Sequence, residues 1–436
     1  MLRGENGAEG EWTMNRLTML QGMKVVDFST FVAGPTCAKI LGEYGADVIR
    51  VEPHIGDSVR YVARQMQGVT NGDNPFYDNI NGNKRQICLE TRTAQGLEVL
   101  HRLLADADVF VCNMRENQAK KSGLDWESLH EKYPKLIYAN VTGYGDHGPL
   151  AGQAGFDNTA YHSRTGLNSA TLQPGETPTT AYTGLGDIPT GTYLAMGVMA
   201  AYVQAQRTGV GEFVTASLYG AGMWSEVFPV VFAQAPYEDR YPKERADRLL
   251  LTQNFRTADG RWFTLNTGNW EKDWPRLAKG LGFDETLIAQ TARLNDAMPV
   301  HRRLYELVTE AFAKEDYAHW NALLNELDIA HDLCQTFREV VDDPAALEAD
   351  LLQPVRYAHS GSEVKLVRSP VQFRLGGLPE TEPARDVGAD TMEILRACGY
   401  AETEIAAMEE QGIIGVPGDP DVYNRYWNSK FDGKKK

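Results

Sequence analysis

Residues 24–52 read KVVDFSTFVAGPTCAKILGEYGADVIRVE and contain two short apolar runs separated by a helical pattern. The first run, residues 24–28, has the length and composition of a buried strand. Pro35 suits the first turn of a helix, and apolar residues follow at helical spacing up to Gly45, a residue type that commonly ends helices. Residues 47–52 predict the next strand. A strand, a helix and a second strand in this order indicate a βαβ unit with parallel strands.

The same alternation continues along the first third of the chain. Further strands are predicted at 85–89, 108–112 and 136–141, with a helix at 93–104. Residues 53–83 predict a loop. The alternation of strands and helices predicts an α/β domain with a doubly wound, Rossmann-like parallel sheet that helices cover on both faces.

The second half of the chain changes character twice. A predicted helix at 188–207 and a strand at 211–218 precede the first change, near Val227. A predicted hairpin at 255–265 and mostly helical segments then continue to about residue 327. Near residue 340 the α/β pattern returns, with elements predicted at 364–373, 391–399 and 402–411. We therefore expect a disordered leader at 1–20, a large α/β domain from 21–226 and 340–436, and a smaller α+β domain at 227–339.

Composition excludes several classes of protein. The chain has 436 residues, 42% of them hydrophobic and 23% charged, as in globular proteins of two or three domains. No apolar run approaches the roughly 18 residues of a membrane span, and the charged N-terminus lacks a secretory signal. The net charge of −16 argues against nucleic acid or an anionic membrane as the main partner. Five scattered cysteines and the dispersed histidines predict no disulfide framework and no metal site, which fits a reducing cytoplasm.

Two segments directly follow predicted strands, at the edge where α/β sheets bind ligands. These are the turn Val32-Ala33-Gly34-Pro35 and the segment Asn113-Met114-Arg115. Arg115 and the nearby Lys121, like Lys84 before another strand, are able to neutralise phosphates. The alternatives are an ordinary turn and a solvated basic surface, and the residues alone leave them open.

Two aspartates stand in glycine-rich surroundings. Asp187 lies in the run Thr183-Gly184-Leu185-Gly186-Asp187-Ile188-Pro189-Thr190-Gly191, just before the predicted helix. A carboxylate presented at such a chain reversal can act as a nucleophile on an activated acyl group, although a helix cap or a turn residue is the alternative. Asp157, in the run Gly155-Phe156-Asp157, has the same alternative of a helix N-cap.

Taken together, these segments resemble the family III CoA-transferases. The resemblance begins at about residue 20 and covers nearly the whole remaining chain. No single segment is specific, but the set in this order is. The matching segments are residues 22–28, 33–35, 45–52, 81–85, 143–145, 155–157, 209–212, 217–218, 388–391 and 399–400, with Asn113 and Arg115.

The resemblance implies a reaction and a site. Asp187 would be the nucleophile of a double displacement that passes through a mixed anhydride and an enzyme–CoA thioester and needs no ATP. Main-chain N–H groups near Gly184 and Gly186 would stabilise an oxyanion. Acyl-CoA would be a substrate, with no tightly bound cofactor and no metal. The positions matched to CoA contacts are Val32, Ala33, Leu89, Arg92, Asn113, Arg115, Lys121, Phe156 and Asp157.

Within the family, the segments around Asp157 and Asp187 look most like the branch that acts on aryl and branched-chain 2-hydroxy acids. That branch includes the phenyllactate/cinnamoyl-CoA and 2-hydroxyisocaproate types of amino-acid fermentation. Val32, Phe156 and Tyr161 would then line an apolar acyl pocket. Val32 replaces a polar residue of formyl-CoA transferase, which argues against oxalate.

The resemblance also implies an architecture and an alternative. Family members are homodimers of interlocked, ring-like subunits with a discontinuous large domain. The alternative activity is that of a 2-methylacyl-CoA racemase, which pairs the matching aspartate with a histidine for proton transfer. Phe156 occupies that histidine's position, and the nearby His162 is out of register.

Overall fold

A computed structural model describes residues 19–61, 68–69, 71–170, 172–237, 244–374 and 376–415. The predicted leader lies outside the described residues except for Met19 and Leu20. The chain divides into two compact units. The large unit consists of Met1–Thr165, Ala181–Val227 and Ala345–Lys436, and the small unit consists of Gly166–Thr180 and Phe228–Pro344.

A seven-stranded sheet in the order β12-β3-β2-β1-β4-β5-β6 forms the centre of the large unit. Strands β1 to β6 are parallel to one another, and β12, at the edge of the sheet, pairs antiparallel with β3. The order 3-2-1-4-5-6 is that of a doubly wound Rossmann sheet, so the predicted fold class is confirmed. The strands are β1 (Lys24–Phe28), β2 (Asp47–Glu52), β3 (Arg85–Leu89), β4 (Val109–Cys112), β5 (Ile137–Thr142), β6 (Phe213–Ser217) and β12 (Ile414–Gly415).

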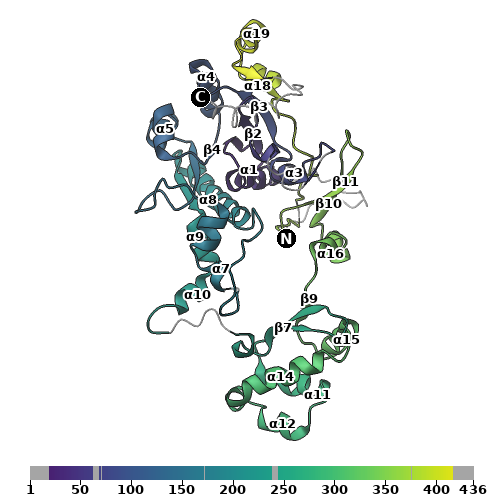
Figure 1. The fold of residues 1–436 in the computed structure, drawn as a ribbon. Coiled ribbons are helices and arrows are strands. Elements are labelled where there is room, and N and C mark those ends of the chain that lie inside the picture. Colours follow the sequence, from purple (N-terminus) through teal and green to yellow (C-terminus); the bar gives the residue numbers. More distant parts are fainter. Residues whose placement is uncertain are drawn as a thin grey trace, which may run out of the picture. The chain divides into compact units, whose positions relative to one another are not determined.

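Helices cover both faces of this sheet because side chains along each strand alternate between two cores. Val25 packs in the core under α1 (Ala33–Glu43) and α8 (Asp187–Thr208). Val26 packs in the opposite core, with α4 (Ala94–Ala105), α6 (Trp126–Lys132), α18 (Thr391–Ala397) and α19 (Glu402–Glu410). Figure 1 shows the yellow C-terminal helices beside the purple and blue strands β2 and β3.

Helix α8 packs closely on α1 because Gly191 has no side chain. A Cβ atom at Gly191 would lie 2.3 Å from the carbonyl oxygen of Ala33 and 2.8 Å from the Cβ of Thr36. The close approach places the first residue of α8, Asp187, near the turn between β1 and α1. The packing of two helices thereby positions a predicted site residue.

The segment between β2 and β3 differs from its prediction. Residues 53–83 were expected to form a loop, but they contain α3 (Pro75–Asn81). Asn74 caps this helix by accepting the N–H of Tyr77, and Pro75 occupies its first turn. The predicted strand at 364–373 is shorter in the structure, where β11 (Glu363–Val367) pairs antiparallel with β10 (Leu352–Arg356). The large unit also contains α5 (Glu116–Ser122), the π-helix η1 (Asp157–Ser163) and α9 (Leu218–Ser225).

The small unit has its own core around a three-stranded antiparallel sheet. The predicted hairpin is present as β7 (Thr252–Arg256) and β8 (Trp262–Asn266), and β9 (His331–Leu333) adds the third strand. No helix among the described residues is long and apolar enough to cross a membrane. The helices of the small unit include α7 (Leu167–Ala170), α11 (Trp270–Gly280), α12 (Glu285–Gln290), α13 (Leu294–Ala297), α14 (His301–Phe312), α15 (Tyr317–Glu326) and α16 (Phe337–Val341). Two further helices, α10 (Val227–Phe232) and α17 (Pro344–Glu348), lie at the boundaries between the two units.

Candidate active site

The strand order reverses between β1 and β4, and the turns that follow these two strands meet there. Crevices at such a reversal are where doubly wound sheets bind ligands. Asn113, directly after β4, accepts the main-chain N–H of Thr30 at 3.1 Å and donates to its carbonyl at 2.9 Å. Asn113 therefore braces the turn after β1, and a contact of its side chain with CoA stays a prediction.

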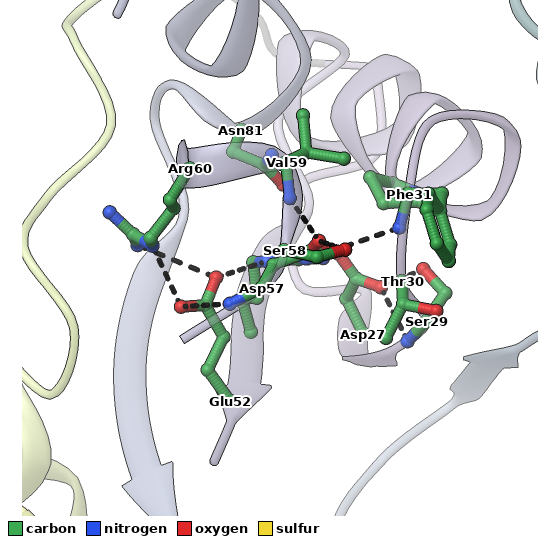
Figure 2. Close-up of polar contacts among 12 residues, drawn as sticks. Asp27, Ser29, Thr30, Phe31, Glu52, Asp57, Ser58, Val59, Arg60 and Asn81 are labelled. Carbon is green, nitrogen blue, oxygen red and sulfur yellow. Dashed lines mark hydrogen bonds and ion pairs between the residues drawn. The ribbon is translucent and has the colours of Figure 1, made fainter. Parts of the chain in front are cut away.

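Side chains hold three successive N–H groups of the turn after β1. Phe31 has a φ of 65°, a left-handed conformation that costs free energy for a residue with a side chain. Figure 2 shows the N–H of Phe31 pointing at the carboxylate of Asp57. The N–H groups of Ser29, Thr30 and Phe31 donate to Asp27, Asn113 and Asp57 respectively, each at 3.1 Å.

Arg50, fully buried on β2, anchors two of these acceptors. Its guanidinium donates to Asp27 at 2.7 Å and to Asp57 at 2.6 Å. Burial opposes the ionisation of Asp27, but the charges of Lys84 and Arg50 outweigh it and hold the pKa of Asp27 well below its usual range. A carboxylate that stays charged keeps its hydrogen bonds to the turn.

The same buried network is balanced in charge. Glu52 receives Arg50 at 2.7 Å and Arg60 at 2.8 Å, and Figure 2 shows the contact with Arg60. With these contacts, three carboxylates, Asp27, Glu52 and Asp57, face three cations. The third cation is Lys84, which donates to Asp27 at 2.9 Å and to the carbonyl of Pro35 at 2.8 Å. Only 1% of the Lys84 side chain is exposed, so it is neither a phosphate ligand nor part of a solvated surface. Both sequence interpretations of Lys84 are wrong.

Asp157 organises the loop before α8. Its carboxylate accepts the N–H of Gly184 at 2.7 Å and that of Gly186 at 3.0 Å, and it lies 3.0 Å from Nε2 of His162. Phe156 is the N-cap residue of η1, and Asp157 is its first residue, so the N-cap alternative for Asp157 is wrong. The structure shows Asp157 as a brace of this loop, and its contact with CoA stays a prediction.

The two glycines of this loop are required by geometry. Gly184 has a φ of +94°, and a Cβ atom at Gly186 would lie 2.3 Å from the ring of Tyr161. Tyr161 is therefore buried below the loop, where its hydroxyl donates to Ser225 at 2.8 Å, and it does not line an open pocket. The N–H groups of Gly184 and Gly186 themselves already bind Asp157, so an oxyanion donor near these glycines would have to be another main-chain N–H group, and that expectation stays a prediction.

Asp187 is the first residue of α8 and is half-buried. Burial and the nearby charge of Asp157 raise the pKa of Asp187 to about 7. The positive end of the helix dipole acts in the opposite sense and favours the anion. A carboxylate with this pKa is ionised in part at neutral pH and is more basic than an ordinary aspartate, as suits a nucleophile.

Several predicted site residues lie together around Asp187. Val32 and Ala33, at the start of α1, are buried, and a Cβ atom at Gly184 would lie 4.0 Å from the Val32 side chain. The ring of Phe156 packs edge to face with that of Phe31, with 5.5 Å between centroids. Contacts between neighbouring segments thus link the residues that the sequence analysis singled out: Val32, Ala33, Asn113, Phe156, Asp157 and Asp187.

The other predicted CoA contacts lie along the same edge of the sheet but not in this cluster. Leu89 ends β3 with its side chain in the core, so any contact with CoA would come from its main chain, and that contact stays a prediction. Arg92 is exposed and binds Glu90. Arg115 and Lys121 are exposed on and before α5, after β4. No cluster of His, Cys, Asp or Glu able to hold a metal ion occurs in the part of the chain that the structure describes.

Sequence reasoning missed the residues that hold the turn, above all Arg50, Asp57 and Phe31. One signal was available: Arg50 interrupts the apolar strand Val48-Ile49-Arg50-Val51, and a charge in a strand buried on both faces requires partners. Nothing in the predicted loop at 53–83 indicated that Asp57 was one of them.

Comparison with known proteins agrees with this geometry. The model of CoA-transferase family III matches residues 20–391. The chain belongs to this family. It is 34% identical over 398 residues to the (R)-2-hydroxy-4-methylpentanoate CoA-transferase of Clostridioides difficile, covering 91% of this chain and 99% of the relative. It is 31% identical over 411 residues to the cinnamoyl-CoA:phenyllactate CoA-transferase of Clostridium sporogenes, covering 92% and 98%.

Solved structures show the same fold for this family III CoA-transferase. A protein of M. tuberculosis, solved in an orthorhombic crystal form, has a TM-score of 0.75 and 26% identity, covering 87% of this chain and all of that one. A CAIB/BAIF family protein from Brucella suis has a TM-score of 0.73 and 25% identity, covering 87% and 99%. The protein is an enzyme that acts on CoA thioesters.

Proposed function

We propose that the enzyme transfers CoA from an acyl-CoA donor to a free carboxylic acid, with Asp187 as the nucleophile. The observation that carries the proposal is the half-buried carboxylate at the start of α8, with its pKa raised to about 7. It lies near the reversal point of the strand order, where the fold binds ligands.

The reaction consists of two exchanges. An oxygen of Asp187 attacks the thioester carbonyl of the donor, the C–S bond breaks, and the CoA thiolate leaves a mixed anhydride behind. The thiolate then attacks Cγ of Asp187, the donor acid leaves as a carboxylate, and an aspartyl-CoA thioester remains. The acceptor carboxylate repeats these steps in reverse. Each exchange forms an activated acyl bond as it breaks another, so no ATP is consumed.

Exposed cations at the carboxyl edge of the sheet support the proposed binding of CoA. Arg115 and Lys121 follow β4, and Arg92 follows β3. In a protein with a net charge of −16, a local group of cations is what the phosphates of CoA require. Arg92 would have to exchange part of its contact with Glu90 for a phosphate.

The proposed acids are aryl or branched-chain 2-hydroxy acids, or the corresponding enoates. Two relatives that match nearly the whole chain carry such acids in their names, whereas the formyl-CoA:oxalate CoA-transferase of Shigella sonnei is 26% identical. The exposed rings of Phe31 and Phe156 suit an apolar acyl group better than a small dianion, whereas the side chain of Val32 is buried and offers no surface to it.

The proposed assembly is a homodimer with interlocked subunits, working in the cytoplasm. Large apolar side chains exposed on α8 and α9 support a partner surface, since monomers rarely leave such groups in water. They are Met196, Val203, Met223 and Trp224. Light scattering after size exclusion tests the assembly: a dimer is expected, and a monomer at micromolar concentration would contradict it.

Mass spectrometry of reaction mixtures tests the activity. Acetyl-, succinyl-, isocaproyl- and cinnamoyl-CoA are each mixed with phenyllactate, 2-hydroxyisocaproate or oxalate, with the wild type and with Asp187→Ala. New acyl-CoA species that disappear in the variant are expected. Deuterium at the α-carbon of a 2-methylacyl-CoA in heavy water, without any exchange of CoA, would instead identify a racemase. The structure does not favour that alternative, because His162 is buried against Asp157.

A further inference from the structure

We propose that Phe31 is a specificity-determining residue that forms, with Phe156, the wall against which the acyl group packs, and that Asp57 positions Phe31 for this role. The inference deepens the proposed function and rests on it, because it takes Asp187 as the atom that the acyl carbonyl approaches. Neither Phe31 nor Asp57 was among the residues that the sequence analysis singled out.

Exposure and contact identify the wall. Phe31, in the turn between β1 and α1, is 44% exposed, and Phe156, at the end of the longer segment between β5 and η1, is 56% exposed. Their rings form an edge-to-face pair, with centroids 5.5 Å apart and an interplanar angle of 83°. An aromatic pair that stays half in water presents apolar surface to any ligand that enters.

The position of this wall relative to Asp187 follows from chain connectivity. Phe156 directly precedes Asp157, whose carboxylate binds the N–H of Gly186, the residue before Asp187. Phe31 directly precedes Val32, whose side chain lies against Gly184 in the same loop. The acyl group is bonded to the carbon that Asp187 attacks, so it must lie within a few ångströms of these two segments.

Asp57 fixes the direction of Phe31. Its Oδ2 accepts the N–H of Phe31 at 3.1 Å, and its other oxygen accepts the N–H of Val59 at 2.9 Å (Figure 2). The same Oδ2 also receives the guanidinium of Arg50 at 2.6 Å. A left-handed backbone at a phenylalanine persists only where its surroundings impose it. The buried ion pair with Arg50 supplies that constraint, because a carboxylate fixed by a charge cannot turn away.

The chemistry of the wall selects large apolar acyl groups. A phenyl or branched alkyl chain gains buried apolar contact with both rings, whereas an acetyl group is too short to gain much. Differences of this kind change kcat/KM by roughly 10- to 200-fold. The wall therefore sets the ratio of kcat/KM for a large acyl-CoA to that for acetyl-CoA, and leaves the chemistry at Asp187 unchanged.

The test measures this ratio, with cinnamoyl-CoA and isocaproyl-CoA as large donors and one fixed acceptor acid. Phe31→Ala removes the ring, and Phe31→Gly also removes the backbone strain. Both variants are expected to lower the ratio about 10-fold or more. Val367→Ala, which truncates an exposed apolar side chain on β11, is the matched control and is expected to leave the ratio unchanged.

Asp57 is tested by a double-mutant cycle. Asp57→Asn alone is expected to lower the ratio, and the same change in the Phe31→Gly background is expected to have no further effect on it. Lys84→Gln, added to Asp57→Asn, restores equal numbers of buried cations and carboxylates and serves if the single variant does not fold. Equal effects of Asp57→Asn in both backgrounds would overturn its role as a positioning residue.

Two failures are distinguishable. A wild type that transfers CoA from no donor refutes the proposed function itself. If the wild type transfers CoA but the Phe31 variants keep the ratio of kcat/KM, the wall is refuted and the proposed function is not. The same holds if the variants raise KM equally for acetyl-CoA and the large donors, because an equal rise places Phe31 against CoA and not against the acyl group.

Discussion

The carboxylate of Asp157 accepts the main-chain N–H of Gly186, the residue directly before Asp187. One buried side chain thus shapes the loop that presents the proposed nucleophile and places a second negative charge near it. That charge and burial together raise the pKa of Asp187 to about 7. Position and basicity of the nucleophile therefore depend on the same residue.

The raised pKa predicts how activity depends on pH. Asp187 attacks only as the anion, so kcat/KM is expected to rise with pH through an apparent pKa of about 7 and to level off above it. Initial rates between pH 5 and pH 9 measure this, with a buffer series at constant ionic strength. A flat profile between pH 5 and pH 7 would contradict an Asp187 with this pKa.

Asp157→Asn is expected to shift that profile to lower pH, because it removes the charge that opposes ionisation of Asp187. It is also expected to lower kcat by roughly 10- to 100-fold, since an amide replaces one acceptor of the loop N–H groups with a donor. Asp125→Asn is the control: it changes a buried carboxylate that caps α6, and asparagine caps equally well. An unchanged pH profile in Asp157→Asn would assign the raised pKa to burial alone.

Asp187→Asn is expected to reduce CoA transfer on the order of 10⁴-fold or more, as the loss of a nucleophile does. It is also expected to stabilise the protein. The pKa of Asp187 is higher in the folded state than the ordinary value of 3.8, so the wild type loses stability as pH rises from about 4 to about 7. The variant escapes this loss, which amounts to roughly a few kcal/mol above pH 7 for a pKa that moves from 3.8 to about 7. Thermal unfolding at pH 4.5 and pH 8 checks the sign; a variant less stable than wild type at pH 8 is the contrary result.

Gly191→Ala is expected to destabilise the large unit by about 1–3 kcal/mol, because the added Cβ atom meets the carbonyl oxygen of Ala33 at 2.3 Å. The start of α8 would shift with it, and CoA transfer would fall even where the protein remains folded. Gly268→Ala adds the same group where nothing lies within 4 Å and serves as the control for stability. Equal denaturant midpoints for both variants would show that α1 and α8 can accommodate the added Cβ atom without loss of stability.

Arg115→Ala is expected to raise KM for every acyl-CoA by roughly 10-fold and to leave kcat nearly unchanged, because a phosphate contact far from the thioester binds ground state and transition state alike. The effect should shrink at high salt. Lys120→Ala is the control, since Lys120 lies on the same helix but pairs with Glu116. A fall in kcat without a change in KM would place Arg115 at the reacting group.

Much of the fold was predictable because its strands are buried on both faces. The predicted strands at 24–28, 47–52 and 85–89 have the bounds of β1, β2 and β3, since runs such as Val25-Val26 are continuous apolar segments between turn residues. The strand β12, Ile414–Gly415, was not predictable, because two residues carry no period and the pairing with β3 is formed only in the folded chain.

The candidate site was predictable where a residue type has a local reason. Glycines around Asp187 pointed to a tight loop, and strand ends placed Asn113 and Val32 at one edge. The buried network was not predictable, because the partners of Arg50 come from separate segments and no sequence spacing links Asp27 to Asp57. The partner of Gly184 and Gly186 was missed for the same reason: Asp157 lies 27 residues from the first and 29 from the second.

In the turn after β1, the contacts that fix the position of residue 31 do not depend on which side chain that residue carries. The backbone at Phe31 takes its direction from Asp57 and Asn113, which accept main-chain N–H groups of the turn, and Arg50 holds the carboxylate of Asp57 in place. None of these bonds involves the phenyl ring. The side chain at position 31 can therefore change during evolution while the hydrogen bonds that hold the turn stay the same. Glycine and asparagine are the easiest replacements, because both tolerate a positive φ. Related enzymes with other acids to activate are expected to differ at this position more than at the residues that hold it.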